Sequence, residues 1–110
     1  MLSIDALALF ESISVGNTTL LIDVRQPEEL IYGTIDNSVN FPLSDIPTRL
    51  EELENLIKNE TKASIVVFCR VGGRSEQVIN FLEQRGSKQL TNLLGGTQKY
   101  SEFDSRIRKY

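Results

Sequence analysis

Short apolar runs alternate along the chain with segments in which apolar residues recur every three or four positions. The clearest runs are Leu20 to Val24 and Ile65 to Phe68, and both are typical of buried strands. Weaker strand signals cover residues 38–41 and 90–94. Apolar strands that alternate with helices are typical of a mostly parallel sheet covered on both faces. The pattern therefore predicts an α/β fold.

Helical periodicity falls between these runs. A proline in its first turn supports the shortest helix, and Gly86 stands where a helix-ending glycine is expected. The last predicted helix is more polar than the others. Five segments are predicted to be helical, namely residues 4–13, 27–31, 46–57, 78–82 and 97–108.

Composition narrows the possible functions. The chain has 110 residues, of which 40% are hydrophobic and 25% charged, which is typical of one globular domain over residues 1–110. The net charge of −3 argues against nucleic acid or an anionic membrane as a partner, so any anion site must be local. No apolar run approaches the roughly 20 residues that span a membrane, and the N-terminus lacks a basic signal-peptide region. We expect a cytoplasmic protein.

The chain contains one cysteine and no histidine. A single cysteine cannot form a disulfide within the chain, and a metal site built from cysteine and histidine is not expected. Cys69 directly follows the strand that ends at Phe68. In parallel sheets, binding and catalytic sites form beyond the carboxyl ends of the strands. The position of Cys69 is therefore that of a candidate functional residue.

A glycine-arginine loop connects this strand to the next helix. Glycines allow successive backbone N–H groups to turn inward and bind an anion, and the helix N-terminus adds positive potential. Arginines supply full charges, and together these groups favour a thiolate without a histidine base. The alternative is a buried cysteine that acts as a small hydrophobic residue. The loop consists of Cys69, Arg70, Val71, Gly72, Gly73 and Arg74.

A second charged pair follows the strand around residue 22. We interpret Asp23 as an ion-pair partner that fixes the turn from strand to helix. Arg25 has two interpretations that the sequence leaves open. It pairs with a glutamate, Glu28 or Glu29, or it reaches the cysteine pocket.

Four stretches, taken in order, resemble the rhodanese domain family. That family has an Asp-x-Arg stretch with a glutamate, a segment from glycine to Asn-x-Pro, a cysteine loop ending in arginine or serine, and a final Leu-x-Gly-Gly. The resemblance covers roughly residues 3–105. The matching residues here are Asp23-Val24-Arg25 with Glu29, Gly33 to Asn40-Phe41-Pro42, Cys69 to Arg74, and Leu94-Gly95-Gly96.

The resemblance implies a rhodanese-like α/β fold, with a central parallel sheet flanked by helices on both faces, and sulfur-transfer chemistry. In such proteins a cysteine, here Cys69, takes a sulfane sulfur from a small anionic donor such as thiosulfate and becomes a persulfide. The acceptor is a thiol, cyanide or a protein. The backbone N–H groups from Arg70 to Arg74 would hold the persulfide, and the arginines would receive the donor. Arg25 matches a substrate-binding position of some members, and no cofactor is expected.

The sequence departs from the family pattern at two places. Residues 33–38 lack the usual histidine and second glycine, and Thr97 and Gln98 stand where an aromatic residue commonly follows the Gly-Gly pair. Tyr100 or Phe103 is predicted to fill that space.

The sequence permits other interpretations of Arg74 and of the function of the chain. Arg74 would either contact the donor anion or tie down the loop through a buried carboxylate. A sulfur relay to a protein partner, and a binding module without catalytic activity, both fit the chain. A phosphatase of related fold would need a loop one residue longer.

Overall fold

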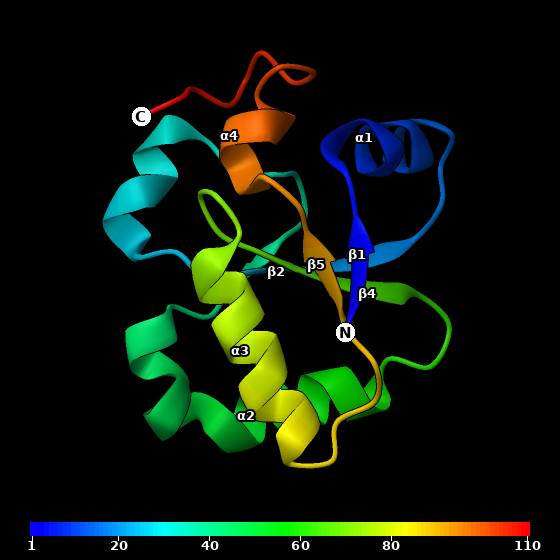
Figure 1. Ribbon diagram of the computed structural model, residues 1–110, viewed down its shortest axis with the longest axis vertical. Helices are drawn as coiled ribbons and strands as arrows, with labels where there is room; N and C mark the ends of the chain where they lie inside the picture. The colour runs from blue at the N-terminus through cyan, green and yellow to red at the C-terminus, as the bar shows by residue number, and fades with distance from the viewer.

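The computed structural model describes residues 1–110 and contains a five-stranded sheet in which every neighbouring pair of strands is parallel, in the order β1-β5-β4-β2-β3. The predicted α/β fold is confirmed. Helices α1 and α4 cover one face of the sheet, and α2 and α3 cover the other (Figure 1). The strands are β1 (Leu2–Ile4), β2 (Thr19–Asp23), β3 (Val39–Asn40), β4 (Ser64–Phe68) and β5 (Thr91–Leu93). The helices are α1 (Ala6–Ser14), α2 (Ile46–Asn59), α3 (Gly73–Gln84) and α4 (Gly96–Tyr100), with 3-10 helices η1 (Pro27–Tyr32) and η2 (Leu43–Asp45).

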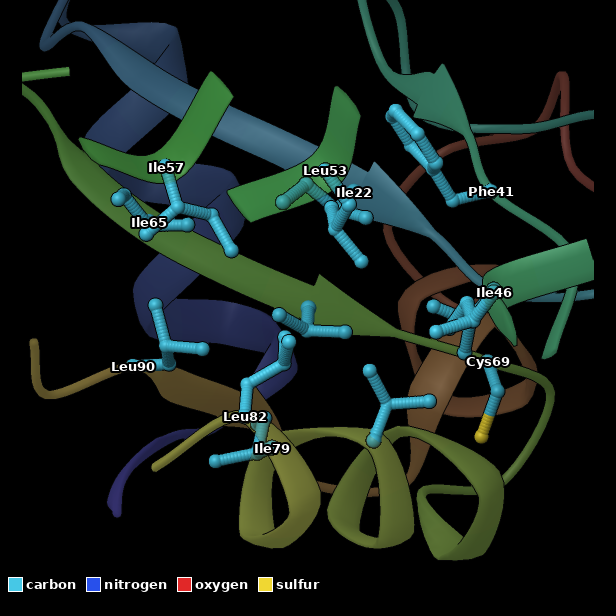
Figure 2. Packing of buried hydrophobic residues seen from close by; sticks show 13 residues of the cluster. Ile22, Phe41, Ile46, Leu53, Ile57, Ile65, Cys69, Ile79, Leu82 and Leu90 are labelled. Atoms are coloured by element: carbon cyan, nitrogen blue, oxygen red, sulfur yellow. The ribbon is translucent and has the colours of Figure 1, made fainter. Parts of the chain in front are cut away.

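The two faces of strand β4 contribute to two separate hydrophobic cores. Ile65 and Val67 pack under α2 and α3, whereas Val66 and Phe68 pack under α1 and α4. This division follows from the alternation of side chains along a strand. Cys69 continues the first set and belongs to the core under α2 and α3. Figure 2 shows its sulfur pointing toward the start of α3.

Two segments differ from the sequence prediction. Residues 2–4 form the edge strand β1, and helix α1 begins only at Ala6, where the Asp5 side chain accepts a hydrogen bond from the N–H of Ala8 at 2.8 Å. The helix predicted over residues 97–108 ends at Tyr100.

Asp104 holds the segment after that last helix in a turn. Its buried carboxylate accepts hydrogen bonds from the backbone N–H and the guanidinium Nε of Arg106, at 3.1 and 3.0 Å. A side chain that binds a nearby backbone N–H offers an alternative to helical hydrogen bonding. The segment from Asp104 to Arg106 therefore does not continue the helix. No helix of the protein is both long and apolar enough to cross a membrane.

The register of the sheet brings the candidate residues to one edge. Strands β2 and β4 end side by side, with Asp23 opposite Phe68. The residues that follow them, Arg25 and Cys69, therefore lie at the same carboxyl edge of the sheet. Strand β5 pairs with β4 and leads into Gly96 at the same edge.

Candidate active site

The sulfur of Cys69 lies inside the loop that follows β4. The backbone N–H of Gly72 donates a hydrogen bond to Sγ at 3.1 Å, and that of Ser75 does so at 3.5 Å. The hydroxyl oxygen of Ser75 lies 3.4 Å from Sγ. Cys69 as a whole is only 1% exposed. The sulfur is therefore surrounded by donors that would stabilise negative charge on it.

These donors decide the protonation of Cys69. Burial raises the pKa of the thiol, but hydrogen bonds from the Ser75 side chain and from the backbone of Ser75, Gly72 and Val71 lower it by more. The net pKa is below the ordinary value of a cysteine. The loop can thus favour the thiolate without a histidine.

Ser75 is a site residue that the sequence analysis missed. It lies in the first turn of α3, directly after Arg74, and is fully buried. Its hydroxyl oxygen is 2.5 Å from Asn92 Oδ1 and 3.1 Å from the carbonyl oxygen of Gly72, as well as close to Cys69. A hydroxyl has one hydrogen and serves one of these acceptors at a time. The signal available in the sequence was a hydroxyl residue at the first turn of the helix that follows the loop.

Two glycines shape the loop and its support. Gly72 adopts φ +108, a left-handed conformation that favours glycine. At Gly96, a Cβ would lie 2.4 Å from the carbonyl oxygens of both Cys69 and Arg70. This close approach lets the N–H groups of Thr97 and Gln98 donate to those carbonyls at 2.9 and 3.0 Å. The Leu94-Gly95-Gly96 stretch therefore lets the start of α4 pack closely against the backbone of the cysteine loop and support it.

Arg74 ties the loop to η1. Its Nη1 and Nη2 donate to Oε2 and Oε1 of Glu29 at 2.7 and 2.9 Å. Arg74 is the main cause that holds the pKa of Glu29 at about 2. In turn Glu29 raises the pKa of Arg74, and the negative charge of Cys69 contributes further. The geometry fits the interpretation of Arg74 as a residue that fixes the loop, and contact with a donor anion stays a prediction.

Arg25 is fully buried, and its donors are used inside the protein. Its Nε and Nη2 bind the carboxylate of Asp23, at 3.0 Å to Oδ1 and 2.8 Å to Oδ2. The remaining bonds go to the carbonyl oxygen of Gly33 at 2.9 Å and the hydroxyl of Tyr110 at 3.1 Å. The predicted ion pair of Asp23 is present, and its partner is Arg25, which binds this carboxylate and not that of Glu28 or Glu29. Substrate binding by Arg25 stays a prediction.

Arg70 is the loop arginine without an acidic partner. None of the salt bridges of the protein involves it, and its Nε is buried without a hydrogen-bond partner. The centre of its guanidinium lies over the ring of Tyr110, 5.0 Å from the ring centroid.

The aromatic residue beside the loop is therefore Tyr110, which the sequence analysis did not select. The two residues predicted for that space lie elsewhere. Tyr100 is buried and packs edge-on against Phe10, with ring centroids 6.0 Å apart, and Phe103, which is 40% exposed, also packs against Phe10.

Comparisons with known proteins agree with this architecture. A sulfurtransferase of Allochromatium vinosum is 32% identical over 93 residues, which cover 84% of this chain and 81% of that protein. The Rhodanese-like/PpiC domain-containing protein 12, chloroplastic, of Arabidopsis thaliana is 38% identical over 91 residues, which are 82% of this chain but 30% of that longer protein.

A solved structure and a family model indicate the same family. The crystal structure of a rhodanese-like domain protein from Staphylococcus aureus has a TM-score of 0.77 to this chain at 26% identity, covering 100% of this chain and 99% of that one. The family model described as the Rhodanese-like domain matches residues 6–103. The chain therefore belongs to the family of rhodanese-like domains.

Proposed function

We propose that the protein is a sulfurtransferase in which Cys69 carries the transferred sulfur as a persulfide. The observation that supports this most directly is the position of Sγ, which accepts N–H hydrogen bonds from Gly72 and Ser75. Donors placed in advance around a sulfur anion stabilise it with little reorganisation. The relative from Allochromatium vinosum is named a sulfurtransferase, which agrees with this chemistry.

The reaction consists of two displacements at sulfur. The Cys69 thiolate attacks the outer sulfur of thiosulfate, a new S–S bond forms, and sulfite leaves with the electrons of the bond that breaks. The terminal sulfur of the persulfide is then attacked by cyanide or a thiolate, and the Cys69 thiolate is regenerated. Atoms and electrons balance without a cofactor, and the covalent intermediate implies ping-pong kinetics.

The two loop arginines have different proposed roles. Arg70, which has no acidic partner, receives the anionic donor, because its charge is not offset inside the protein. Arg74 is held by Glu29 and fixes the loop, while its charge still acts on the sulfur. Arg25 stabilises the strand-to-helix turn through Asp23 and acts on the site through that turn.

Steady-state kinetics test this proposal. Thiocyanate formation from thiosulfate and cyanide should give parallel double-reciprocal lines, because the two substrates react in separate steps. Cys69→Ser should abolish turnover. Intersecting lines, or wild-type rates in Cys69→Ser, would contradict a persulfide mechanism.

A sulfur relay to a protein acceptor is a second candidate. The observation in its favour is Val71, an apolar loop residue that is 56% exposed beside a site otherwise suited to anions. This side chain offers an anion no hydrogen bond, but it can bury apolar surface against a protein acceptor. Slow turnover with cyanide, together with fast sulfur transfer to a protein thiol that Val71→Ser weakens, would favour the relay.

A further inference from the structure

The C-terminal segment, residues 104–110, runs beside η1 and brings an aromatic ring to the cysteine loop. In Figure 1 the red end of the chain lies next to the cyan helix that precedes β3. The backbone N–H of Arg108 donates to the carbonyl oxygen of Tyr32 at 2.8 Å. The rings of Tyr32 and Tyr110 stack, with centroids 4.2 Å apart and planes inclined by 10°. Tyr110 is thus anchored by η1.

The hydroxyl of Tyr110 fixes the ring a second time. It donates to Oε1 of Glu29 at 2.9 Å and accepts from Nη1 of Arg25 at 3.1 Å. One phenol therefore connects the two ion pairs of the site, Asp23 with Arg25 and Glu29 with Arg74. A ring held by both stacking and hydrogen bonds is a rigid surface at this edge of the sheet.

Arg70 rests on that surface. Its guanidinium lies over the Tyr110 ring, 5.0 Å from the centroid, and none of the salt bridges of the protein involves it. A carboxylate in the same place would position the arginine but cancel its charge. An aromatic face attracts the cation and leaves its full charge available to a ligand.

We propose that Tyr110 is a positioning residue that holds Arg70 beside Cys69 and thereby makes the site selective for anionic sulfur donors. The inference rests on the proposed function for the identity of the ligand. Its physical content, a ring that places a positive charge next to the cysteine, can be measured without sulfur transfer.

Alkylation of Cys69 by two reagents of similar size and different charge makes that measurement. The ratio of the rate with iodoacetate to the rate with iodoacetamide reports the positive potential at the sulfur. Because the limited access to a cysteine that is 1% exposed affects both reagents alike, it cancels in the ratio. The fraction of Cys69 that is ionised affects both rates equally and therefore also cancels in the ratio.

Four variants and one control separate the contributions. Arg70→Ala should lower the ratio about three- to ten-fold, the effect of one nearby charge in a partly aqueous site. Tyr110→Leu should lower it about two- to five-fold because the guanidinium is released. Tyr110→Phe keeps the ring and should retain more than half of the selectivity. The double variant Arg70→Ala with Tyr110→Leu should match Arg70→Ala alone, and Phe103→Leu, a matched change of an exposed aromatic residue, should leave the ratio unchanged.

Two results would overturn the proposal. One is a further loss when Tyr110→Leu is added to Arg70→Ala, since the ring would then act by another route. The other is an equal loss in Tyr110→Phe and Tyr110→Leu, since the hydroxyl network would then be responsible. If Tyr110→Leu does not fold, Tyr110→Met in its place keeps an apolar side chain of similar length and gives the same comparison.

Failure of the proposed function has a different signature. If Cys69 accepted sulfur from no donor while the alkylation ratios behaved as expected, the anion-selective site would stand and its ligand would not be a sulfur donor. If persulfide formed normally and Tyr110→Leu left both the ratio and the KM for thiosulfate unchanged, the positioning role would be refuted and the sulfurtransferase would stand.

Discussion

Arg74 and Glu29, which are 45 positions apart in the chain, form a bidentate ion pair with N–O distances of 2.7 and 2.9 Å. The pair joins the last residue of the cysteine loop to the 3-10 helix that follows β2. Paired charges in this fork geometry fix orientation as well as distance. The loop that surrounds Cys69 therefore depends on a contact with a distant part of the sequence.

Replacing Glu29 with Gln should lower the free energy of unfolding at neutral pH. It should also reduce the loss of stability as the pH falls. The pKa of Glu29 is lowered from 4.5 to about 2 in the folded protein, so its stabilising effect is complete above the unfolded value and is lost as pH falls through that window. Because a third of the Arg74 side chain is exposed, solvent screening limits the loss on mutation to about 1–2 kcal/mol. Urea unfolding of the wild type and the variant at pH 7 and pH 3 measures the loss of stability at each pH.

Glu28→Gln is the matched control for that experiment, since Glu28 is the exposed neighbour in the same helix. It should leave the free energy of unfolding nearly unchanged at both pH values. If Glu29→Gln cost as much at pH 3 as at pH 7, the ionised carboxylate would not be the stabilising species.

Ser75→Ala should raise the pKa of Cys69. The hydroxyl is the first among the hydrogen-bond donors that oppose the effect of burial. Its loss should slow the reaction of Cys69 with iodoacetamide at neutral pH by about three- to ten-fold and move the pH–rate profile to higher pH. Ser87→Ala, a change beyond the far end of α3 at a serine whose hydroxyl donates to the carbonyl oxygen of Lys88, is the control. An unmoved profile in folded Ser75→Ala would exclude the hydroxyl as a thiolate donor.

Gly96→Ala should be far more costly than Gly16→Ala. Both glycines have positive φ, but a Cβ at Gly16 meets nothing within 4 Å, whereas at Gly96 it collides with the backbone of Cys69 and Arg70. The strain in φ alone costs about 1 kcal/mol, and the collision should raise the loss to about 2–4 kcal/mol. Denaturant unfolding compares the two, and similar losses would mean that the close approach is easily relieved.

Much of the fold was predictable because its signals are local. The strands β2 and β4, the helix that becomes α2 and the helix stop at Gly86 each follow from a few adjacent residues. The first strand was not predicted, because Leu2–Ile4 is a short edge strand whose last residue also begins the helical repeat of α1. The pairing with β5 that makes it a strand is invisible in the local pattern.

The candidate site also combines features with a local sequence signal and features that depend on long-range contacts. Cys69 and its glycine-arginine loop were predictable from residues in sequence. The partners of that loop were not, because Glu29 and Tyr110 reach it only through the folded chain. A carboxylate partner for Arg74 was predicted without its identity, and an aromatic residue was predicted close to the Gly-Gly pair. No local pattern marks Tyr110, which contacts Arg25 across 85 positions.

Arg70→Ala should impair anionic donors selectively. A charge-assisted hydrogen bond is worth enough to lower kcat/KM for thiosulfate about ten- to a hundred-fold, mostly through KM. An uncharged sulfane donor should lose about three-fold or less. Arg85→Ala removes an arginine that pairs with Glu54 at the opposite end of α3 and should change neither value. Equal losses with both donors would show that Arg70 does not act as an anion contact.

Intact mass measurement tests the persulfide most directly. The protein is incubated with thiosulfate, desalted and weighed, alongside Cys69→Ser, and then treated with cyanide. The account predicts that the wild type alone gains the mass of one sulfur atom and loses it to cyanide as thiocyanate. A wild type that gains no mass although Cys69 is alkylated at neutral pH, or an equal gain in Cys69→Ser, would contradict sulfur transfer from thiosulfate through Cys69.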